Sequence, residues 1–285
     1  MSAVARVRVL AGPVLSLLAR APRRARIRAG ARAAYLELGS AVVVLTTPDT
    51  PWLPNAIVLS GPLPAADGMA TLAPGRIALP GWTAAWNPRS VAVWDPVMAT
   101  VKPAQRAELG ERGRVLLDAL GPAPPEAAAL AGPDLVAARS AALDLLGRGP
   151  GLTPEGDDVL MGACVALAAA GRRRRAVALL PSRLRARTTA LSATLLELAA
   201  AGAGAEPLHA LLDVRSQRWP AALARLEGLG SSSGRAMAMG AAAAAAATQA
   251  SGSGSPRSDS GRGPKMRRSS SVMATSLMLA SRRRM

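Results

Sequence analysis

The 285-residue sequence has no phenylalanine, one tyrosine, one histidine, one cysteine and only two lysines. With Cys164 alone, an intrachain disulfide and a thiolate metal cluster are excluded, which fits a reducing cytoplasm. With His209 alone, a multi-histidine metal site is excluded, and its position after Pro207 favours a helix-start or surface histidine. No apolar run reaches the roughly 20 residues that a membrane-spanning helix needs. We therefore expect a cytoplasmic protein without a membrane partner, whose metal requirement and cofactor the sequence leaves unknown.

The N-terminus partly imitates a secretory signal. Val9 to Leu18 is apolar and follows Arg6 and Arg8, which is the order of a signal peptide. Pro13 interrupts this run, however, and five arginines follow within residues 23 to 32. We therefore favour a folded N-terminal segment over a signal peptide.

The net charge of +17 raises the question of nucleic-acid binding. Nearly all of this charge is arginine, as a GC-rich genome favours. It is also uneven, since residues 251 to 285 hold eight Arg/Lys and one Asp, which gives +7 and leaves +10 for the other 250 residues. The near-absence of Phe and Tyr removes the stacking surfaces that single-strand binders use. We expect a solvated surface and no nucleic-acid partner.

The pattern of elements predicts an α+β protein: a β-rich N-terminal region over 1–102, a mainly helical region over 103–248, and a disordered basic tail over 249–285. The β-rich region shows short apolar runs between Pro- and Gly-containing turns, at Ala34–Thr46, Asn55–Leu59, Arg76–Leu79 and Ser90–Trp94. Helical spacing predicts helices at Ala104–Leu120, Pro133–Leu146, from Pro154, Arg187–Ala201, Pro207–Leu212 and Ser232–Ala247, with Arg172–Arg175 as a solvated turn. Ser, Gly, Pro and Arg dominate the tail, a composition typical of disorder.

The segment Gly147–Gly162, GRGPGLTPEGDDVLMG, carries the strongest functional signal. Its loop glycines, which include Gly149 and Gly151, allow positive φ and a close approach to a ligand. Thr153 is a natural N-cap and is followed by proline at the first helical position. A helix start of this kind favours an anion, and Asp157 and Asp158 are the candidate catalytic carboxylates.

Two other interpretations of this segment deserve comparison. Gly151 and Gly156 satisfy G-x-x-x-x-G, but Asp157 and Asp158 stand where a P-loop requires Lys and Ser/Thr, so a triphosphate site is excluded. Alternatively, the two acids merely complement the helix dipole, which is worth about 0.3–1 kcal/mol each. That explanation accounts for the acids but not for the glycines before them, so we favour a functional site.

A second segment, Gly228–Gly240 (GLGSSSGRAMAMG), repeats the pattern of glycine loop, hydroxyl cap and glycine-bearing helix. Ser231, Gly234 and Gly240 align with Thr153, Gly156 and Gly162, at the same spacings of three and six residues. Two independently capped helices would explain it as well. The shared spacing favours one common site for a small anionic ligand. The predicted substrate-binding residues are Gly149, Gly151, Thr153, Gly156, Arg187, Ser231, Ser232 and Gly234.

These segments resemble a bacterial family of unknown-function domains typified by AllH, a subunit of oxamate carbamoyltransferase. Its hallmark is similar to G-x-G-L-T-P-S-G-D-D-x-L-x-G, which Gly149 to Gly162 matches, and it continues with R-[TS]-T-x-L-S at Arg187–Ser192 and a glycine-serine helix start at Gly230–Gly234. Two departures stand out. Glu155 replaces a small hydroxyl residue, and Arg235-Ala236 stand where the family tends to have an aromatic and an acid.

The resemblance implies a subunit of a multi-subunit carbamoyltransferase that acts in allantoin and purine catabolism. It would convert oxalurate and phosphate to oxamate and carbamoyl phosphate, together with partner subunits. Arg187 would clamp a carboxylate or phosphate, and Asp157→Asn is expected to abolish activity. The alternative is a non-catalytic protein that binds a small carboxylate or another anion in a regulatory role.

Overall fold

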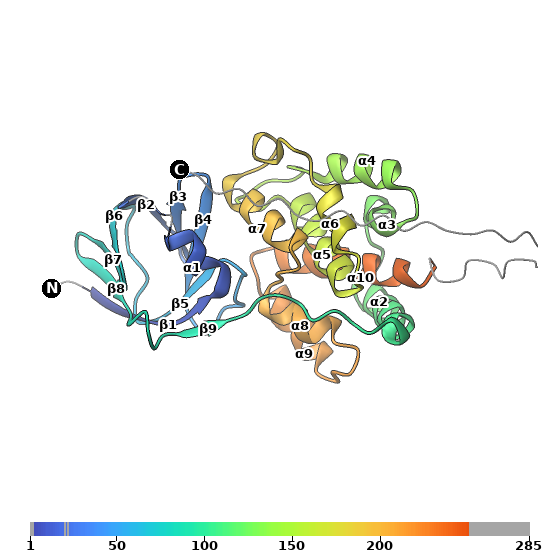
Figure 1. The fold of residues 1–285 in the computed structure, drawn as a ribbon, viewed down its shortest axis with the longest axis horizontal. Coiled ribbons are helices and arrows are strands. Elements are labelled where there is room, and N and C mark those ends of the chain that lie inside the picture. The colour runs from blue at the N-terminus through green and yellow to red at the C-terminus, as the bar shows by residue number, and fades with distance from the viewer. Residues whose placement is uncertain (1–2, 20, 22, 251–285) are drawn as a thin grey trace, which may run out of the picture. The chain divides into compact units, whose positions relative to one another are not determined.

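A computed structural model describes residues 3–19, 21 and 23–250, and it confirms the α+β class. Strands fill the N-terminal part and helices the C-terminal part (Figure 1). The strands are β1 (Ala3–Ala11), β2 (Arg24–Ala29), β3 (Ala34–Leu38), β4 (Ala41–Thr46), β5 (Ala56–Ser60), β6 (Gly68–Ala73), β7 (Arg76–Leu79), β8 (Trp82–Ala85) and β9 (Ala92–Trp94). The helices are α1 (Gly12–Ala19), α2 (Arg106–Leu120), α3 (Pro125–Ala131), α4 (Leu135–Leu145), α5 (Glu155–Ala169), α6 (Arg173–Leu179), α7 (Ala190–Ala200), α8 (Glu206–Leu212), α9 (Trp219–Glu227) and α10 (Ser233–Ala250). The predicted disordered tail lies almost entirely outside the described residues.

The strands form a closed barrel. Their order is β5-β4-β3-β2-β6-β7-β8-β1-β9, and an additional pairing between β5 and β1 closes the sheet. β1 serves three neighbours because a register shift between Val7 and Val9 redirects it from β8 toward β9 while it pairs with β5. Closure removes the unpaired strand edges that would otherwise invite aggregation.

Several strands were missed by the sequence analysis, and β2 shows why. It reads RARIRA, with its arginines exposed and Ala25 and Ile27 buried in the barrel. The period of two is present, but alanine and arginine are poor strand formers and conceal it. The apolar stretch from Val9 to Leu18 is divided between β1 and α1. The predicted strand over 34–46 is two strands, because Gly39 turns the chain at a φ of 64°.

The helices surround α5, which is buried on every side from Gly156 to its last residue. A helix without a polar face needs neighbours all round, and α5 packs against α10, α7, α6, α3 and α4. The contact with α10 is the closest. A Cβ built on Gly162 would lie 1.9 Å from the Met237 carbonyl oxygen, and one on Gly240 would lie 1.9 Å from that of Val159. Glycine at both positions lets the two backbones touch.

The prediction of a solvated turn at Arg172–Arg175 is wrong, because α6 begins at Arg173. Arg172 and Arg175 also do not simply point into solvent. Arg172 donates to the Ala131 carbonyl oxygen at 3.2 Å, and the Arg175 Nε donates to that of Leu130 at 3.1 Å. Both arginines thus satisfy orphan carbonyls at the end of α3, a helix that the sequence analysis also missed. A run of arginines is easily taken for a solvated segment when the carbonyl oxygens that it binds are far away in the sequence.

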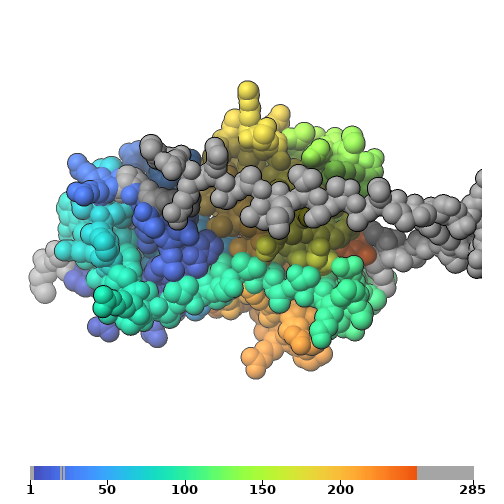
Figure 2. All heavy atoms as spheres, in the orientation of Figure 1, coloured from blue at the N-terminus to red at the C-terminus, as the bar shows by residue number. Residues whose placement is uncertain are grey.

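The segment after β9 connects the barrel to the helices and lies along the helical part (Figures 1 and 2). The Met98 amide donates to the Gly202 carbonyl oxygen, and the Val101 amide to that of Ala169, both at 2.8 Å. Barrel and helices therefore pack as one unit. His209 belongs to this junction, as its Nε2 lies 3.1 Å from the Pro96 carbonyl oxygen and its ring lies 5.8 Å from that of Trp94. It is a half-buried packing residue in the last turn of α8, and not the helix-start or surface histidine that the sequence analysis favoured.

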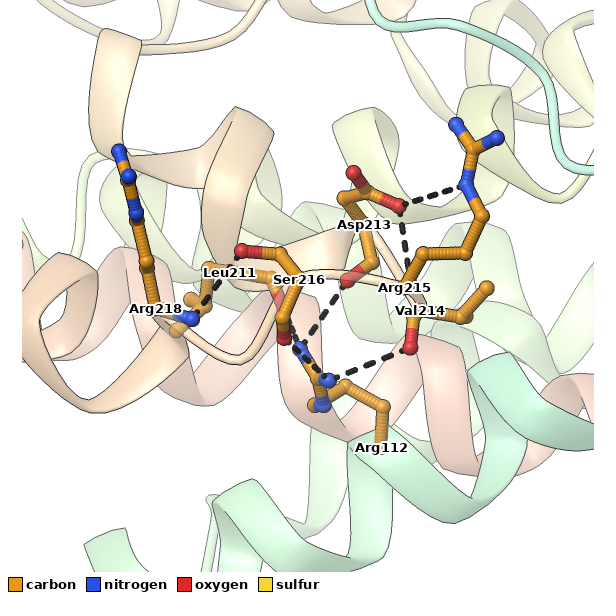
Figure 3. A network of polar contacts seen from close by, with 7 residues as sticks. All are labelled: Arg112, Leu211, Asp213, Val214, Arg215, Ser216 and Arg218. Atoms are coloured by element: carbon orange, nitrogen blue, oxygen red, sulfur yellow. Dashed lines mark hydrogen bonds and ion pairs between the residues drawn. The ribbon is translucent and has the colours of Figure 1, made fainter.

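Arg112 of α2 holds the end of α8 in place. Its guanidinium donates to four main-chain oxygens at 3.0 to 3.5 Å, those of Leu211, Asp213, Val214 and Ser216 (Figure 3). The same group lies 5.8 Å from the centre of the Trp219 ring. The Leu211 oxygen belongs to the last turn of α8, whose carbonyls lack intrahelical donors, and the other three oxygens belong to the residues that follow the helix, so one arginine fastens both.

We expect Arg112→Met to lower the free energy of unfolding by about 2 kcal/mol, because several carbonyls lose a charged donor. The control is Arg114→Met in the same helix, whose exposed ion pair with Glu111 should contribute less than about 0.5 kcal/mol. Urea unfolding of the two variants measures the difference. Equal losses would show that Arg112 does not act as a cap.

Among the described residues, no helix is both long enough and apolar enough to cross a bilayer.

Candidate functional site

The loop before α5 has the geometry that its glycines predict. Gly147, Gly149 and Gly151 adopt φ values of 74°, 112° and 100°, which only glycine accepts at low cost. The prediction of Thr153 as N-cap is wrong, because α5 begins at Glu155 and its N-cap is Pro154, without a side-chain cap. Instead of capping the helix, the Thr153 hydroxyl forms a hydrogen bond with the Ser233 hydroxyl, with the two oxygens 3.0 Å apart.

Asp157 fastens this loop to the helices. It is fully buried, and its Oδ1 accepts a hydrogen bond from the Gly147 amide at 2.8 Å. Its Oδ2 accepts one from the Thr188 hydroxyl. Both oxygens are therefore occupied within the protein, as expected of a residue that positions a loop. The prediction that Asp157 is catalytic remains untested.

Asp158 is in the opposite situation. Only 1% of it is exposed, yet neither carboxylate oxygen has a hydrogen-bond partner among the described residues. Burial raises the pKa of its carboxyl to about 8, although the nearby hydroxyls of Ser233 and Thr153 oppose the shift. Those two hydroxyl oxygens face each other, and neither reaches Asp158 with hydrogen-bond geometry. An unsatisfied buried carboxyl of this kind requires an explanation.

Asp158 is one of the residues that line a cavity of about 200 Å³ between the barrel and the helices. Thr46, Thr50 and Tyr35 of the barrel side face it, as do Leu191 and Met237 of the helical side. The cavity is smaller than the roughly 300–1,000 Å³ of pockets for drug-sized ligands, so it suits a small molecule. Its lining is mainly apolar, with Asp158 and the exposed Arg32 as the charged residues among those described.

Both glycine-rich segments reach this cavity, as the repeat predicts. Thr153 and Asp158 come from the first segment, and Gly230 and Ser233 from the second. The shared spacing of three and six residues has a different cause, however. Gly156 and Gly234 each pack against a carbonyl oxygen of the preceding helix, and Gly162 and Gly240 form the crossing of α5 and α10. The glycine spacing thus reflects packing rather than ligand contact.

Of the predicted substrate-binding residues, Thr153 lines the cavity. The others lie outside its lining as far as the described residues define it: Gly149, Gly151, Gly156, Arg187, Ser231, Ser232 and Gly234. Arg187, Ser231 and Ser232 are exposed.

The start of α5 is also poorly suited to an anion. The amide of Gly156 donates to the Arg148 carbonyl oxygen, and the amides of Asp157 and Asp158 donate to that of Pro154. The donors that would hold an anion are thus engaged, and two carboxylates lie beside them. Anion binding at this helix start remains a prediction without structural support.

Sequence reasoning missed Ser233 and the whole barrel wall. Ser233 directly follows the two serines that were chosen. The GSSSG run therefore indicated that a serine takes part, but it could not show which of the three serines faces the cavity. Tyr35, Thr46 and Thr50 could not be found, because they join Asp158 in the lining of one cavity only through the packing of the barrel on the helices. Within the described part of the chain, no group of three or more His, Cys, Asp or Glu side chains could hold a metal ion.

Residues 145–245 match the family model described as oxamate carbamoyltransferase subunit AllH. The resemblance predicted from the hallmark is confirmed over this segment, which runs from the end of α4 into α10 and provides the helical wall of the cavity. The barrel lies outside the matched residues. No curated protein and no solved structure is significantly similar to the chain.

Proposed function

We propose that this chain is a subunit of a multi-subunit carbamoyltransferase related to oxamate carbamoyltransferase, and that the Asp158 cavity is its substrate site. One observation carries the proposal. The segment that matches the family model contributes Thr153, Asp158 and Ser233 to a cavity that contains an unpartnered buried carboxyl. Asp157 is then a positioning residue, because its carboxylate is already occupied by the loop and by Thr188.

The chemistry of carbamoyl transfer needs a group that can both give and take a proton near neutral pH. In the direction from oxalurate to oxamate, a phosphate oxygen attacks the carbamoyl carbon, and the bond from that carbon to the oxamate nitrogen breaks. The proton that hydrogen phosphate loses is the one that the departing nitrogen gains. A carboxyl with a pKa of about 8 is protonated often enough to donate and is basic enough to recover the proton.

The test is reconstitution of the assembly. The full chain is co-expressed with the products of its neighbouring genes, and phosphate-dependent formation of carbamoyl phosphate from oxalurate is measured. Asp158→Leu should abolish turnover, whereas Asp157→Asn should lower it only as far as it lowers the amount of folded protein. An assembled complex without transfer activity would overturn the proposal, and ligand-induced thermal shifts without turnover would favour a binding protein instead.

A further inference from the structure

We propose that the Asp158 cavity binds the terminal –C(=O)NH₂ group of its ligand, with the Asp158 carboxyl pairing with both the nitrogen and the oxygen of that amide. This inference rests on the proposed function for the identity of the ligand. It concerns which end of the ligand enters the protein. The helix-start pattern in the sequence favours the opposite orientation, with a carboxylate or phosphate innermost.

The hydrogen-bonding capacity of Asp158 fits an amide. A protonated carboxyl has one O–H donor and one carbonyl acceptor, and a primary amide presents the complementary acceptor and donor in one plane. Both Asp158 oxygens are unpartnered among the described residues, so a single amide would satisfy the two at once. Burial keeps this carboxyl protonated to higher pH than usual, in the form that such a pair requires.

The charges of the cavity disfavour an anion at its buried end. The lining contributes Asp158 as its buried charged residue, and Arg32, its one cationic member among those described, is exposed. A carboxylate buried next to Asp158 would therefore lack a buried cation to compensate the cost of removing its charge from water.

Oxamate and pyruvate provide a sharp test, because they differ only in an amide nitrogen that replaces a methyl group. Both carry the same carboxylate and nearly the same shape. We expect the full-length chain to bind oxamate about tenfold more tightly than pyruvate in calorimetric titrations at neutral pH, since the amide N–H donates one hydrogen bond to Asp158 that the methyl group of pyruvate cannot. Equal affinities would overturn the inference, because they would show that the shared carboxylate is what the protein recognises. A chain that binds neither would overturn it too.

Two substitutions connect the preference to Asp158. Asp158→Leu keeps the approximate shape but removes both hydrogen-bonding groups, so the preference for oxamate should vanish. Asp158→Asn retains one donor and one acceptor, so much of the preference should remain. Glu155→Gln, which removes an exposed charge from the same helical turn, is the control and should bind like the unaltered protein. Retention of the full preference by Asp158→Leu would exclude Asp158 as the recognition group.

The failure of this inference can be separated from the failure of the proposed function. A reconstituted assembly that transfers carbamoyl groups, with a chain that binds oxamate and pyruvate equally, would sustain the function and refute the buried amide. A chain that prefers oxamate in an assembly without transfer activity would do the reverse.

Discussion

Gly162→Ala is expected to destabilise the protein by about 3 kcal/mol or more, enough to unfold much of the chain. The added methyl carbon would lie 1.9 Å from the Met237 carbonyl oxygen and 2.8 Å from the Ala241 nitrogen. Both are backbone atoms in the middle of α10, so no side-chain rotation can relieve the clash. The two helices must separate, and α5 and α10 form the most extensive contact between helices in the protein.

The reciprocal contact makes the same prediction for Gly240→Ala, whose methyl would lie 1.9 Å from the Val159 carbonyl oxygen. Gly12→Ala is the matched control. Gly12 begins α1, and its added methyl would find only the Trp94 carbonyl oxygen, at an ordinary 3.6 Å. Its effect should be neutral or slightly stabilising, because alanine favours a helix over glycine. Thermal unfolding followed by circular dichroism measures all three variants, and an unchanged midpoint for Gly162→Ala would contradict the close crossing.

The structure gives the glycines of α5 and α10 a packing role that the sequence analysis did not predict, while the predicted role of Gly156 and Gly234 in substrate binding stays a prediction. Gly147, Gly149 and Gly151 have the positive φ that their loop predicts. The helical glycines, by contrast, are needed where two backbones meet, and a single sequence cannot distinguish a carbonyl of a neighbouring helix from a ligand. A small residue reveals that something approaches closely, but not what approaches.

The two predicted acids illustrate the same limit. Asp157 and Asp158 are adjacent in sequence, and both were expected to serve chemistry. About 100° of helical rotation separates them, so one carboxylate faces the loop and the other faces the cavity. Which of them faces the cavity depends on the placement of Thr188 and of the barrel wall. Those are long-range contacts, which local pattern does not encode.

The α+β class, by contrast, was predictable, because turn residues and apolar periodicity are local properties. The closure of the barrel was not. It depends on the pairing of β1 with β5, β8 and β9, and β1 was not predicted as a strand at all. Arginines at alternate positions also made β2 resemble a charged linker.

Asp158→Asn is expected to change how the stability of the protein depends on pH. The Asp158 carboxyl has its pKa raised by burial from 3.8 to about 8 in the folded protein. Between these two values the folded state holds a proton that the unfolded state has released, so stability is fully present below about pH 4 and is lost as the pH rises toward 8. The contribution of this one group is about 1.4 kcal/mol per pH unit across that window.

Asparagine cannot ionise, so the variant should lack this loss and should gain stability over the unaltered protein with each unit of rising pH. Urea unfolding at intervals from pH 5 to pH 8 gives the two slopes. The control is Asp118→Asn on the exposed face of α2, which removes one negative charge without touching the cavity and should keep the original slope. If the free energy of unfolding had the same pH dependence in Asp158→Asn and in the unaltered protein, burial would not raise the pKa of the Asp158 carboxyl. Both the proposed transfer chemistry and the proposed binding of an amide require Asp158 to be protonated near neutral pH. The pH dependence of stability tests this shared requirement without a substrate.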